Sequence, residues 1–341
     1  MKAINFGIIG LGSVAQHHIK SIKESDLCNL VSVSSRNEEK LLEAKDKYGV
    51  STYTDFLHMV QDPNVDVVCI CTPSGNHMEP TLAAADAGKH VLVEKPLEVS
   101  VDRAKQMIEA CQKADVQLSC IFQNRFSPDF QKAYEAVQNG TLGKLVLGNA
   151  YIKWFRDQAY YDAADWRGTF SGDGGAALIN QSIHTIDLLL QVMGPVKSVM
   201  GKVKTLTHDI EGEDIGTATL EFESGALGTI EGSTSIYQGY PEKLEVHGTK
   251  GNIILEGGKI TQWQVAGTDD HDFNTSTDQA TGSSDPTAIG HVLHQSQIDK
   301  FAKSISNDQP TPVGGDSAIR SLEVIQAIYE SSKTGKEVLI K

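Results

Sequence analysis

A glycine-rich turn near the start of the chain constrains the fold more than any other feature. The stretch FGIIGLGSVA places Gly10 and Gly12 directly after an apolar run, with Ala15 three residues further on. In the dinucleotide fingerprint, the first glycine permits a tight turn, the second lets a pyrophosphate approach the backbone, and a small third residue lets helix and strand pack closely. The stretch therefore predicts a strand, a phosphate-binding turn and a helix. A glycine turn that serves packing alone is the alternative.

Two pairs of residues refine the cofactor prediction. Ser13 and Val14 open the expected helix, whose N-terminal N–H groups would face the phosphates. After the second expected strand, VSVSSRN carries Ser35 and Arg36 where NAD-binding proteins usually place a carboxylate for the ribose 2′-hydroxyl. A hydroxyl and a guanidinium suit a 2′-phosphate, so the sequence favours NADP over NAD. In the alternative, Arg36 is a solvated surface charge and NAD binds through other groups.

The pattern of strands and helices predicts two domains. The first third alternates apolar strand-like runs with helix-like segments, which predicts a doubly wound parallel sheet. Later runs such as IGTATLEFES and EKLEVHGTKG, separated by glycine-containing turns, indicate a mostly antiparallel sheet. We expect an α/β fold with a dinucleotide-binding Rossmann domain at 1–122 and a substrate-binding and oligomerisation domain at 123–341. A polar loop is expected at 267–286, and helices near 291–306 and 316–334 close the chain.

Charge and cysteine content exclude several classes of protein. The formal net charge of −14 argues against nucleic acid or an anionic membrane surface as a partner. No apolar run approaches the roughly 20 residues of a membrane helix. The five cysteines form no Cys-x-x-Cys pair, which indicates reduced thiols in a cytoplasmic protein without a disulfide framework or a zinc site. We expect His17 and His18 on a helix surface, and no bound metal.

One predicted helix carries polar residues where apolar ones are expected. The stretch GAALINQSIHTIDLLLQVMGP holds Asn180, His184 and Asp187, which at ~100° per residue fall within a wedge of ~60°. An imidazole is suited to acid–base work near neutral pH, so His184 is the candidate base. Asn180 cannot take a proton and would hydrogen-bond the substrate or orient a ring nitrogen. Asp187 either orients His184 or is a structural carboxylate bound to backbone.

A lysine follows an expected parallel strand. VLVEKPL places Lys95 at the carboxyl end of that strand, and ligands of open α/β sheets bind outside such ends. Its ammonium group can hold a reacting oxygen and stabilise an alkoxide by charge. A surface lysine after a strand is the alternative.

Several motifs occur together in one order along the chain. GIIGLGSVA is followed by CTPSGNHMEP, AGKHVLVEKPL, QNRFSP and GDGGAALINQSIHTIDLL. Over nearly its whole length the chain resembles the Gfo/Idh/MocA family of oxidoreductases. The resemblance implies a Rossmann domain, an α/β domain whose open sheet often forms the oligomer interface, and Lys95 as the signature lysine. Many members carry Asp where this chain has Asn180.

One branch of that family is more similar than others. The stretch WFRDQAYYDAADWRGT, followed by NQSIHTIDLL, resembles the branch that oxidises UDP-N-acetylglucosaminuronate at its 3-hydroxyl. The members of that branch use NAD, and the pair Ser35 and Arg36 departs from this.

Further residues are expected around the two ligands. The residues expected to border the cofactor, beside those of the glycine turn, are Thr72, Pro73, His77, Glu94, Lys95, Gln123, Trp166 and Arg167. The residues expected to bind substrate are Lys95, Arg125, Tyr160, Arg167, Asn180 and His184. For Tyr160, Tyr161, His291 and His294, a structural role is as plausible as a place beside the substrate.

These residues lead to one predicted reaction and two alternatives. We expect an NAD(P)-dependent dehydrogenase that acts on a ring hydroxyl of a sugar, cyclitol or nucleotide sugar. Lys95 would anchor the oxygen and His184 would exchange its proton. The expected assembly is a homodimer or homotetramer formed through the C-terminal sheet. The alternatives are a glycosidase that uses NAD transiently and a non-catalytic nucleotide-sensing protein.

Overall fold

The computed structural model describes residues 3–267, 283 and 290–340. Internal contacts divide the chain into two units, Met1–Gln123 with Gly290–Ile319, and Asn124–Ile289 with Arg320–Lys341. The predicted domains met at a single boundary after residue 122. The observed division differs, because residues 290–319 belong to the first unit. Their helix α9 (Val292–Ser306) buries Ile298, Phe301 and Ala302 in the core beneath helix α1 (Ser13–Lys23). The expected polar loop lies outside the described residues, except for Gly267 and Ser283.

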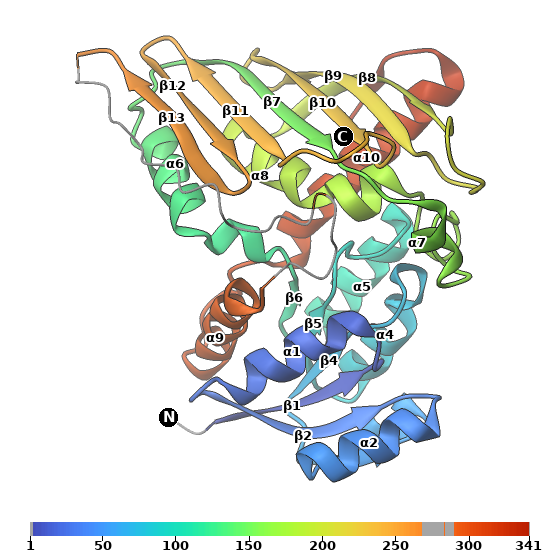
Figure 1. Ribbon diagram of the computed structural model, residues 1–341. Helices are drawn as coiled ribbons and strands as arrows, with labels where there is room; N and C mark the ends of the chain where they lie inside the picture. The colour runs from blue at the N-terminus through green and yellow to red at the C-terminus, as the bar shows by residue number, and fades with distance from the viewer. Residues whose placement is uncertain (1–2, 268–282, 284–289, 341) are drawn as a thin grey trace. The chain divides into compact units, whose positions relative to one another are not determined.

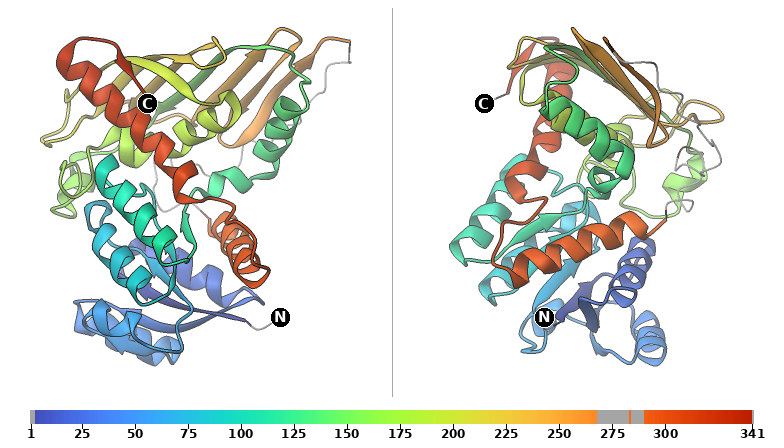
Figure 2. Two further views of the ribbon diagram at one scale, coloured as in Figure 1. Left: turned by 180° about the vertical axis from the view of Figure 1, so that it is seen from behind. Right: turned by 90° about the vertical axis from the view of Figure 1, so that its left-hand side faces the viewer.

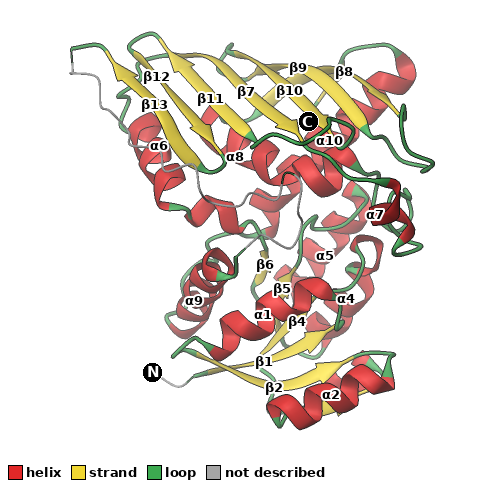
Figure 3. Cartoon of the chain, viewed as in Figure 1, coloured by secondary structure: helices red, strands yellow, loops and turns green. Residues whose placement is uncertain are grey.

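The first unit is built on a parallel sheet of six strands, in the order β3-β2-β1-β4-β5-β6 (Figure 1; Figure 3). The strands are β1 (Ile4–Ile9), β2 (Cys28–Ser34), β3 (Ser51–Tyr53), β4 (Val67–Ile70), β5 (His90–Val93) and β6 (Leu118–Cys120). The helices are α1, α2 (Glu38–Tyr48), α3 (Phe56–Val60), α4 (Met78–Asp86), α5 (Val101–Lys113) and α9. The predicted doubly wound sheet is confirmed.

Local chemistry explains why these elements form. Strand β4 is buried along its whole length, as expected for a central parallel strand covered on both faces. Helix α2 begins where the Asn37 side chain accepts a hydrogen bond from the Lys40 N–H, and it ends at Gly49, whose φ of 68° favours glycine. The short elements β3 and α3 were not predicted, because three to five residues show no periodicity.

The second unit contains a sheet of eight strands, in the order β13-β12-β11-β7-β10-β9-β8-β14. It is antiparallel except for the β7–β10 pair, so the predicted mostly antiparallel sheet is confirmed. The strands are β7 (Leu145–Lys153), β8 (Val196–Lys204), β9 (Ile215–Phe222), β10 (Leu227–Ser233), β11 (Lys243–Gly248), β12 (Gly251–Glu256), β13 (Lys259–Val265) and β14 (Val338–Leu339).

Helices cover one face of this second sheet. They are α6 (Pro128–Gln138), α8 (Ile183–Met193) and α10 (Gly315–Thr334), and Figure 2 shows them on the same side of the strands. The approach is close at Gly201 of β8, where an added Cβ would lie 2.8 Å from the Ile328 side chain of α10. The short α7 (Gln158–Asp162) lies in a stretch predicted as a polar loop. Among the helices described, none has the length and hydrophobicity needed to cross a membrane.

The helix predicted at 175–195 has two parts. A π-helical turn, Ala177–Ser182, precedes α8, which ends at Gly194. The first backbone donors of this segment bind Glu213 instead of the preceding turn. The Ala176 N–H and the Leu178 N–H donate to its carboxylate at 3.1 and 2.7 Å, and the Ala177 N–H donates to its backbone carbonyl at 2.9 Å. Glu213 thus satisfies N–H groups that the start of a helix leaves without an intrahelical partner.

Candidate active site

The glycine-rich turn has the geometry that a pyrophosphate requires. Gly10 has φ 92°, and an added Cβ would lie 2.7 Å from the Cys71 carbonyl oxygen. Gly12 is the N-cap of α1, where no side chain caps the helix, and an added Cβ would meet nothing within 4 Å. Ser13 and Val14 follow as the first helical residues, and the first turn holds no acidic residue. The open helix N-terminus therefore suits an anionic group.

The end of β2 lies beside this turn. The Gly10 N–H donates to the Ser34 carbonyl at 2.9 Å. The next two residues are the predicted 2′-phosphate ligands. The Ser35 hydroxyl accepts a hydrogen bond from the Asn37 N–H at 3.1 Å, and Arg36 is exposed. Both residues are therefore at the surface end of the strand that borders the phosphate-binding turn.

The loops after β4 and β5 are joined by His77. This side chain is buried, with Nε2 3.1 Å from the Thr72 carbonyl oxygen and Nδ1 3.0 Å from the Pro96 carbonyl oxygen. Burial lowers its pKa, and the hydrogen bonds to the two carbonyl oxygens act in the opposite direction. His77 therefore supports the loop holding Thr72 and Pro73, and also the segment that begins with the half-buried Lys95.

Glu94 directly precedes Lys95 in the sequence, and its side chain contacts His18 of α1. Its carboxylate is 2.6 Å from His18 Nε2, and it accepts a hydrogen bond from the Lys95 N–H at 3.1 Å. Burial opposes ionisation, but the hydrogen bond from His18 lowers the pKa of Glu94 to about 2. The prediction that His18 lies on the helix surface is wrong, because its side chain is fully buried.

The histidines near the end of the chain belong to the first unit. His291 Nε2 lies 2.7 Å from a Glu24 carboxylate oxygen, and His294 Nε2 lies 3.9 Å from the Glu94 carboxylate. His294 is buried, and its ring stacks on that of His17. Gln123, the last residue of the unit's first segment, is also buried.

In the second unit, the π turn changes how Asn180 and His184 are arranged around the helix axis. Positions four apart in an α-helix differ by about 40° around the axis, whereas a π turn rotates less per residue. Asn180 lies in the π turn and His184 in the first turn of α8, so the two come closer to one line than predicted. Both side chains are half-buried.

Asp173 holds the amide of Asn180. The Asn180 Nδ2 donates to one carboxylate oxygen of Asp173, and the Gly168 N–H donates to the other at 3.1 Å. Asp173 is 1% exposed, so this carboxylate is fixed by its hydrogen bonds. It was not predicted, although GDGG directly before an apolar segment is an available signal.

A second group of contacts surrounds Tyr160. The Arg167 guanidinium lies 4.3 Å from the centre of the Tyr160 ring, and Arg167 Nη1 donates to the Tyr160 carbonyl at 2.7 Å. Gln181 Nε2 donates to the Tyr160 hydroxyl at 2.8 Å, and Arg156 Nη2 donates to Gln181 Oε1 at 3.0 Å. The structure thus brings Tyr160 and Arg167 together with Gln181, the neighbour of Asn180. Arg156 and Gln181 were not predicted.

Three other predicted residues have defined partners. Trp166 lies beside Arg167, whose guanidinium is 5.8 Å from its ring centre. The Tyr161 hydroxyl lies 2.8 Å from the Thr234 hydroxyl. Arg125 forms a buried bidentate ion pair with Asp187, at 2.7 Å from Nε and 2.5 Å from Nη2. The pair gives Asp187 a structural role through a side chain, where backbone groups were expected as its partners, and it occupies the guanidinium expected to bind substrate.

Comparisons with known proteins identify the family of the chain. Two family profiles match the chain, the oxidoreductase family with an NAD-binding Rossmann fold over residues 4–122 and the GFO/IDH/MocA C-terminal domain over residues 130–254. Myo-inositol 2-dehydrogenase of Thermotoga maritima is 35% identical over 264 residues, covering 76% of this chain and 77% of that protein. The scyllo-inositol 2-dehydrogenase (NADP(+)) IolW of Bacillus subtilis is 25% identical, covering 99% and 96%.

A solved structure is similar over the whole chain. The WlbA dehydrogenase from Bordetella pertussis, in complex with NADH and UDP-GlcNAcA, has a TM-score of 0.89 at 30% identity, covering 100% of this chain and 99% of that one. This similarity supports the branch indicated by the sequence. The chain belongs to the Gfo/Idh/MocA family and is an NAD-binding oxidoreductase.

Proposed function

Because the chain is a Gfo/Idh/MocA oxidoreductase, we propose that it transfers hydride between a nicotinamide dinucleotide and a ring hydroxyl of a sugar, cyclitol or nucleotide sugar. The proposal rests above all on Asn180 and His184, two half-buried polar side chains aligned on a mostly buried segment. Relatives whose names specify inositols support the substrate class. The first unit would bind the dinucleotide and the second the substrate.

Three residues of the chain would carry the chemistry. The bound nicotinamide supplies the hydride acceptor or donor. Lys95, after β5, holds the reacting oxygen and stabilises negative charge that develops on it. His184 accepts the hydroxyl proton in oxidation and returns it in reduction. Asp173 holds the NH₂ end of the Asn180 amide, and Gln181 Nε2 donates to the Asn180 oxygen at 3.4 Å, so a substrate hydroxyl would donate to the second lone pair of that oxygen.

A His184→Ala variant tests the role of the imidazole. We expect turnover to fall by about 10²- to 10⁴-fold, the usual contribution of general acid–base catalysis, while dinucleotide binding is unchanged. His58→Ala is the matched control, because His58 is exposed on α3. Equal turnover in the His184 variant and the control would refute the assignment.

Within this substrate class, we propose an acidic nucleotide sugar of the UDP-N-acetylglucosaminuronate type. Arg167 supports this proposal, because its half-buried guanidinium lies beside Tyr160 and Gln181 and suits a carboxylate or phosphate. The bound ligand of the WlbA dehydrogenase has this chemistry. UDP-N-acetylglucosamine is the matched comparison, since it lacks only the carboxylate. Faster oxidation of myo-inositol than of the uronate would favour a cyclitol substrate instead.

We also propose that NADP is preferred over NAD. The support is the exposed Arg36, which follows Ser35 at the end of β2. The residues from the end of β2 to the cap residue Asn37 include no carboxylate that could bind a ribose 2′-hydroxyl. Arg36→Ala should raise the KM for NADP much more than that for NAD. Lys45→Ala, which removes another exposed cation of α2, is the control for general charge effects. Equal effects of Arg36→Ala on both cofactors would contradict the 2′-phosphate role.

Assembly and location are proposed on two further observations. Leu147 and Leu227 are paired across β7 and β10 and are exposed, as is Met200 of β8, which supports a homodimer or homotetramer formed through this sheet. Light scattering of Leu147→Glu, which should dissociate the assembly, tests this. None of the five cysteines, all of which lie within the described residues, forms a disulfide, which supports a reducing, cytoplasmic location.

A further inference from the structure

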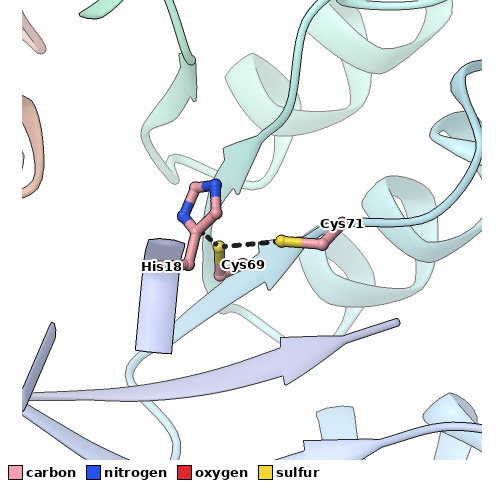
Figure 4. Close-up of side chains that lie close together, drawn as sticks. All are labelled: His18, Cys69 and Cys71. Atoms are coloured by element: carbon pink, nitrogen blue, oxygen red, sulfur yellow. Dashed lines mark hydrogen bonds between the residues drawn. The ribbon is translucent and has the colours of Figure 1, made fainter. Parts of the chain in front are cut away.

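Side chains of the kind that bind metals gather in the core of the first unit, beneath the dinucleotide turn. They are His18 of α1, Cys69 of β4, Cys71 directly after β4, Glu94 after β5, and His294 of α9, and all five are buried. Cys69 and Cys71 are two residues apart on a strand, so their side chains share one face of the sheet. Figure 4 shows His18 directed at that face, with its ring against Cys69.

The distances within this cluster favour one set of ligands. Tetrahedral zinc, with bonds of about 2.3 Å to sulfur and 2.0–2.1 Å to nitrogen, places two sulfurs about 3.8 Å apart and sulfur about 3.6 Å from nitrogen. Here the two Sγ atoms are 3.8 Å apart and Cys69 Sγ is 3.2 Å from His18 Nδ1. All three ligand atoms lie within 4.8 Å of one another. Only small side-chain shifts would be needed to close around an ion.

The other possible set of ligands, His18, Glu94 and His294, fits less well. His18 Nε2 and the Glu94 carboxylate are 2.6 Å apart, the length of a hydrogen bond. Two such atoms bound to one zinc ion would be about 3.3 Å apart. Glu94 instead has the place of a carboxylate that orients a ligating histidine, because it accepts from Nε2 and leaves Nδ1 facing the sulfurs. This arrangement recurs at zinc sites in proteins.

We propose that His18, Cys69 and Cys71 bind a thiophilic cation of the Zn²⁺ or Cu⁺ type, with Glu94 as the carboxylate that orients His18. Thiolates select such ions over hard cations. Binding replaces the two S–H bonds and the Nδ1–H bond of the His18 imidazolium by three metal–ligand bonds and releases three protons, and no electron is transferred. Because the Cys71 carbonyl lies against Gly10, the ion would stabilise β4 at the point where it supports the phosphate-binding turn. The proposal does not depend on the proposed substrate.

Metal content of the whole chain provides the test. The reduced protein is stripped with a chelator, incubated with ZnCl₂ and desalted, and zinc is measured by mass spectrometry. We expect one ion per chain. In parallel, Co²⁺ should give the near-ultraviolet charge-transfer absorption of a cobalt–thiolate bond. Failure to retain zinc, or cobalt binding without this absorption, would overturn the proposal.

Variants locate the ion. Cys69→Ser with Cys71→Ser should abolish both signals, and Glu94→Gln should weaken zinc binding by about 10- to 100-fold, as loss of an orienting carboxylate does elsewhere. Cys111→Ser is the matched control, because Cys111 is a buried cysteine of α5 outside the cluster. His294→Asn should retain zinc. Loss of zinc in the His294 variant alone would assign the ion to the other set and overturn the proposal.

If the variants fail to fold, the site can still be tested on the unaltered chain. Native alkylation with N-ethylmaleimide, followed by peptide mass spectrometry, reports each cysteine separately. Zinc should slow the labelling of Cys69 and Cys71 and leave that of Cys111 unchanged. Equal labelling with and without zinc would contradict the site.

Discussion

The ion pair between Arg125 and Asp187 should be worth far more to stability than an exposed pair. The two side chains are 8% and 2% exposed and are joined by two hydrogen bonds. Asp187→Ala leaves the guanidinium buried after its carboxylate is lost. We therefore expect the free energy of unfolding to fall by about 3 to 5 kcal/mol, as it does when one member of a buried pair is removed.

An exposed pair in the same unit supplies the comparison. Lys197 and Glu221 are 2.7 Å apart, but their side chains are 50% and 38% exposed. Solvent screening limits such pairs, so Lys197→Ala should lower the free energy of unfolding far less than Asp187→Ala does. The difference between the two variants isolates the effect of burial, since the pairs have similar contact distances.

Thermal unfolding followed by circular dichroism measures both variants. At about 2–4 °C per kcal/mol for a unit of this size, Asp187→Ala should lower Tm by about 6 to 20 °C. Arg125→Met combined with Asp187→Leu should recover much of this loss, because an apolar pair leaves no buried charge. Equal shifts for Asp187→Ala and Lys197→Ala would refute the reasoning, as would a double variant less stable than either single one.

Three other predictions concern the turn, the amide and a buried acid. Gly10→Ala should lower Tm, because a Cβ would meet the Cys71 carbonyl at 2.7 Å, whereas Gly12→Ala should keep Tm and weaken NAD(P)H binding measured by fluorescence; the reverse pattern would be incompatible with the turn's role. Asp173→Asn should lower kcat more than it alters KM for the cofactor, because it frees the Asn180 amide to rotate; unchanged kcat would contradict this. Burial raises the pKa of Glu213 from 4.5 to about 7, so the folded state holds its proton more tightly than the unfolded chain. Its contribution to stability, full below pH 4.5, should be lost as pH rises through 7, by about 3 kcal/mol. Urea unfolding across this range tests it, and the slope should disappear in Glu213→Gln.

The glycine turn and the sheet types could be predicted from sequence because each depends on a local pattern. Gly10 and Gly12 stand at the end of an apolar run, and the strands of both sheets have recognisable lengths and spacing. Burial of His18 was also predictable in principle. It follows Ala15 by three residues and precedes Ile22 by four, so it belongs to the apolar stripe of α1.

Other features depend on contacts between distant parts of the chain. The π turn before α8 is capped by Glu213, more than thirty residues away, which accepts its first backbone donors. Asp187 was placed beside His184 by periodicity, but its partner Arg125 is 62 residues away in sequence. No pattern within one element contains such information.

The position of α9 has a consequence for how the chain is made. The first unit consists of Met1–Gln123 and Gly290–Ile319, so its core lacks Ile298, Phe301 and Ala302 until strands β7 to β13 of the second unit have been synthesised. A fragment that ends after β6 would expose to water the part of α1 that packs against α9. The Rossmann core is therefore completed by a helix that is encoded after seven of the eight strands of the second sheet.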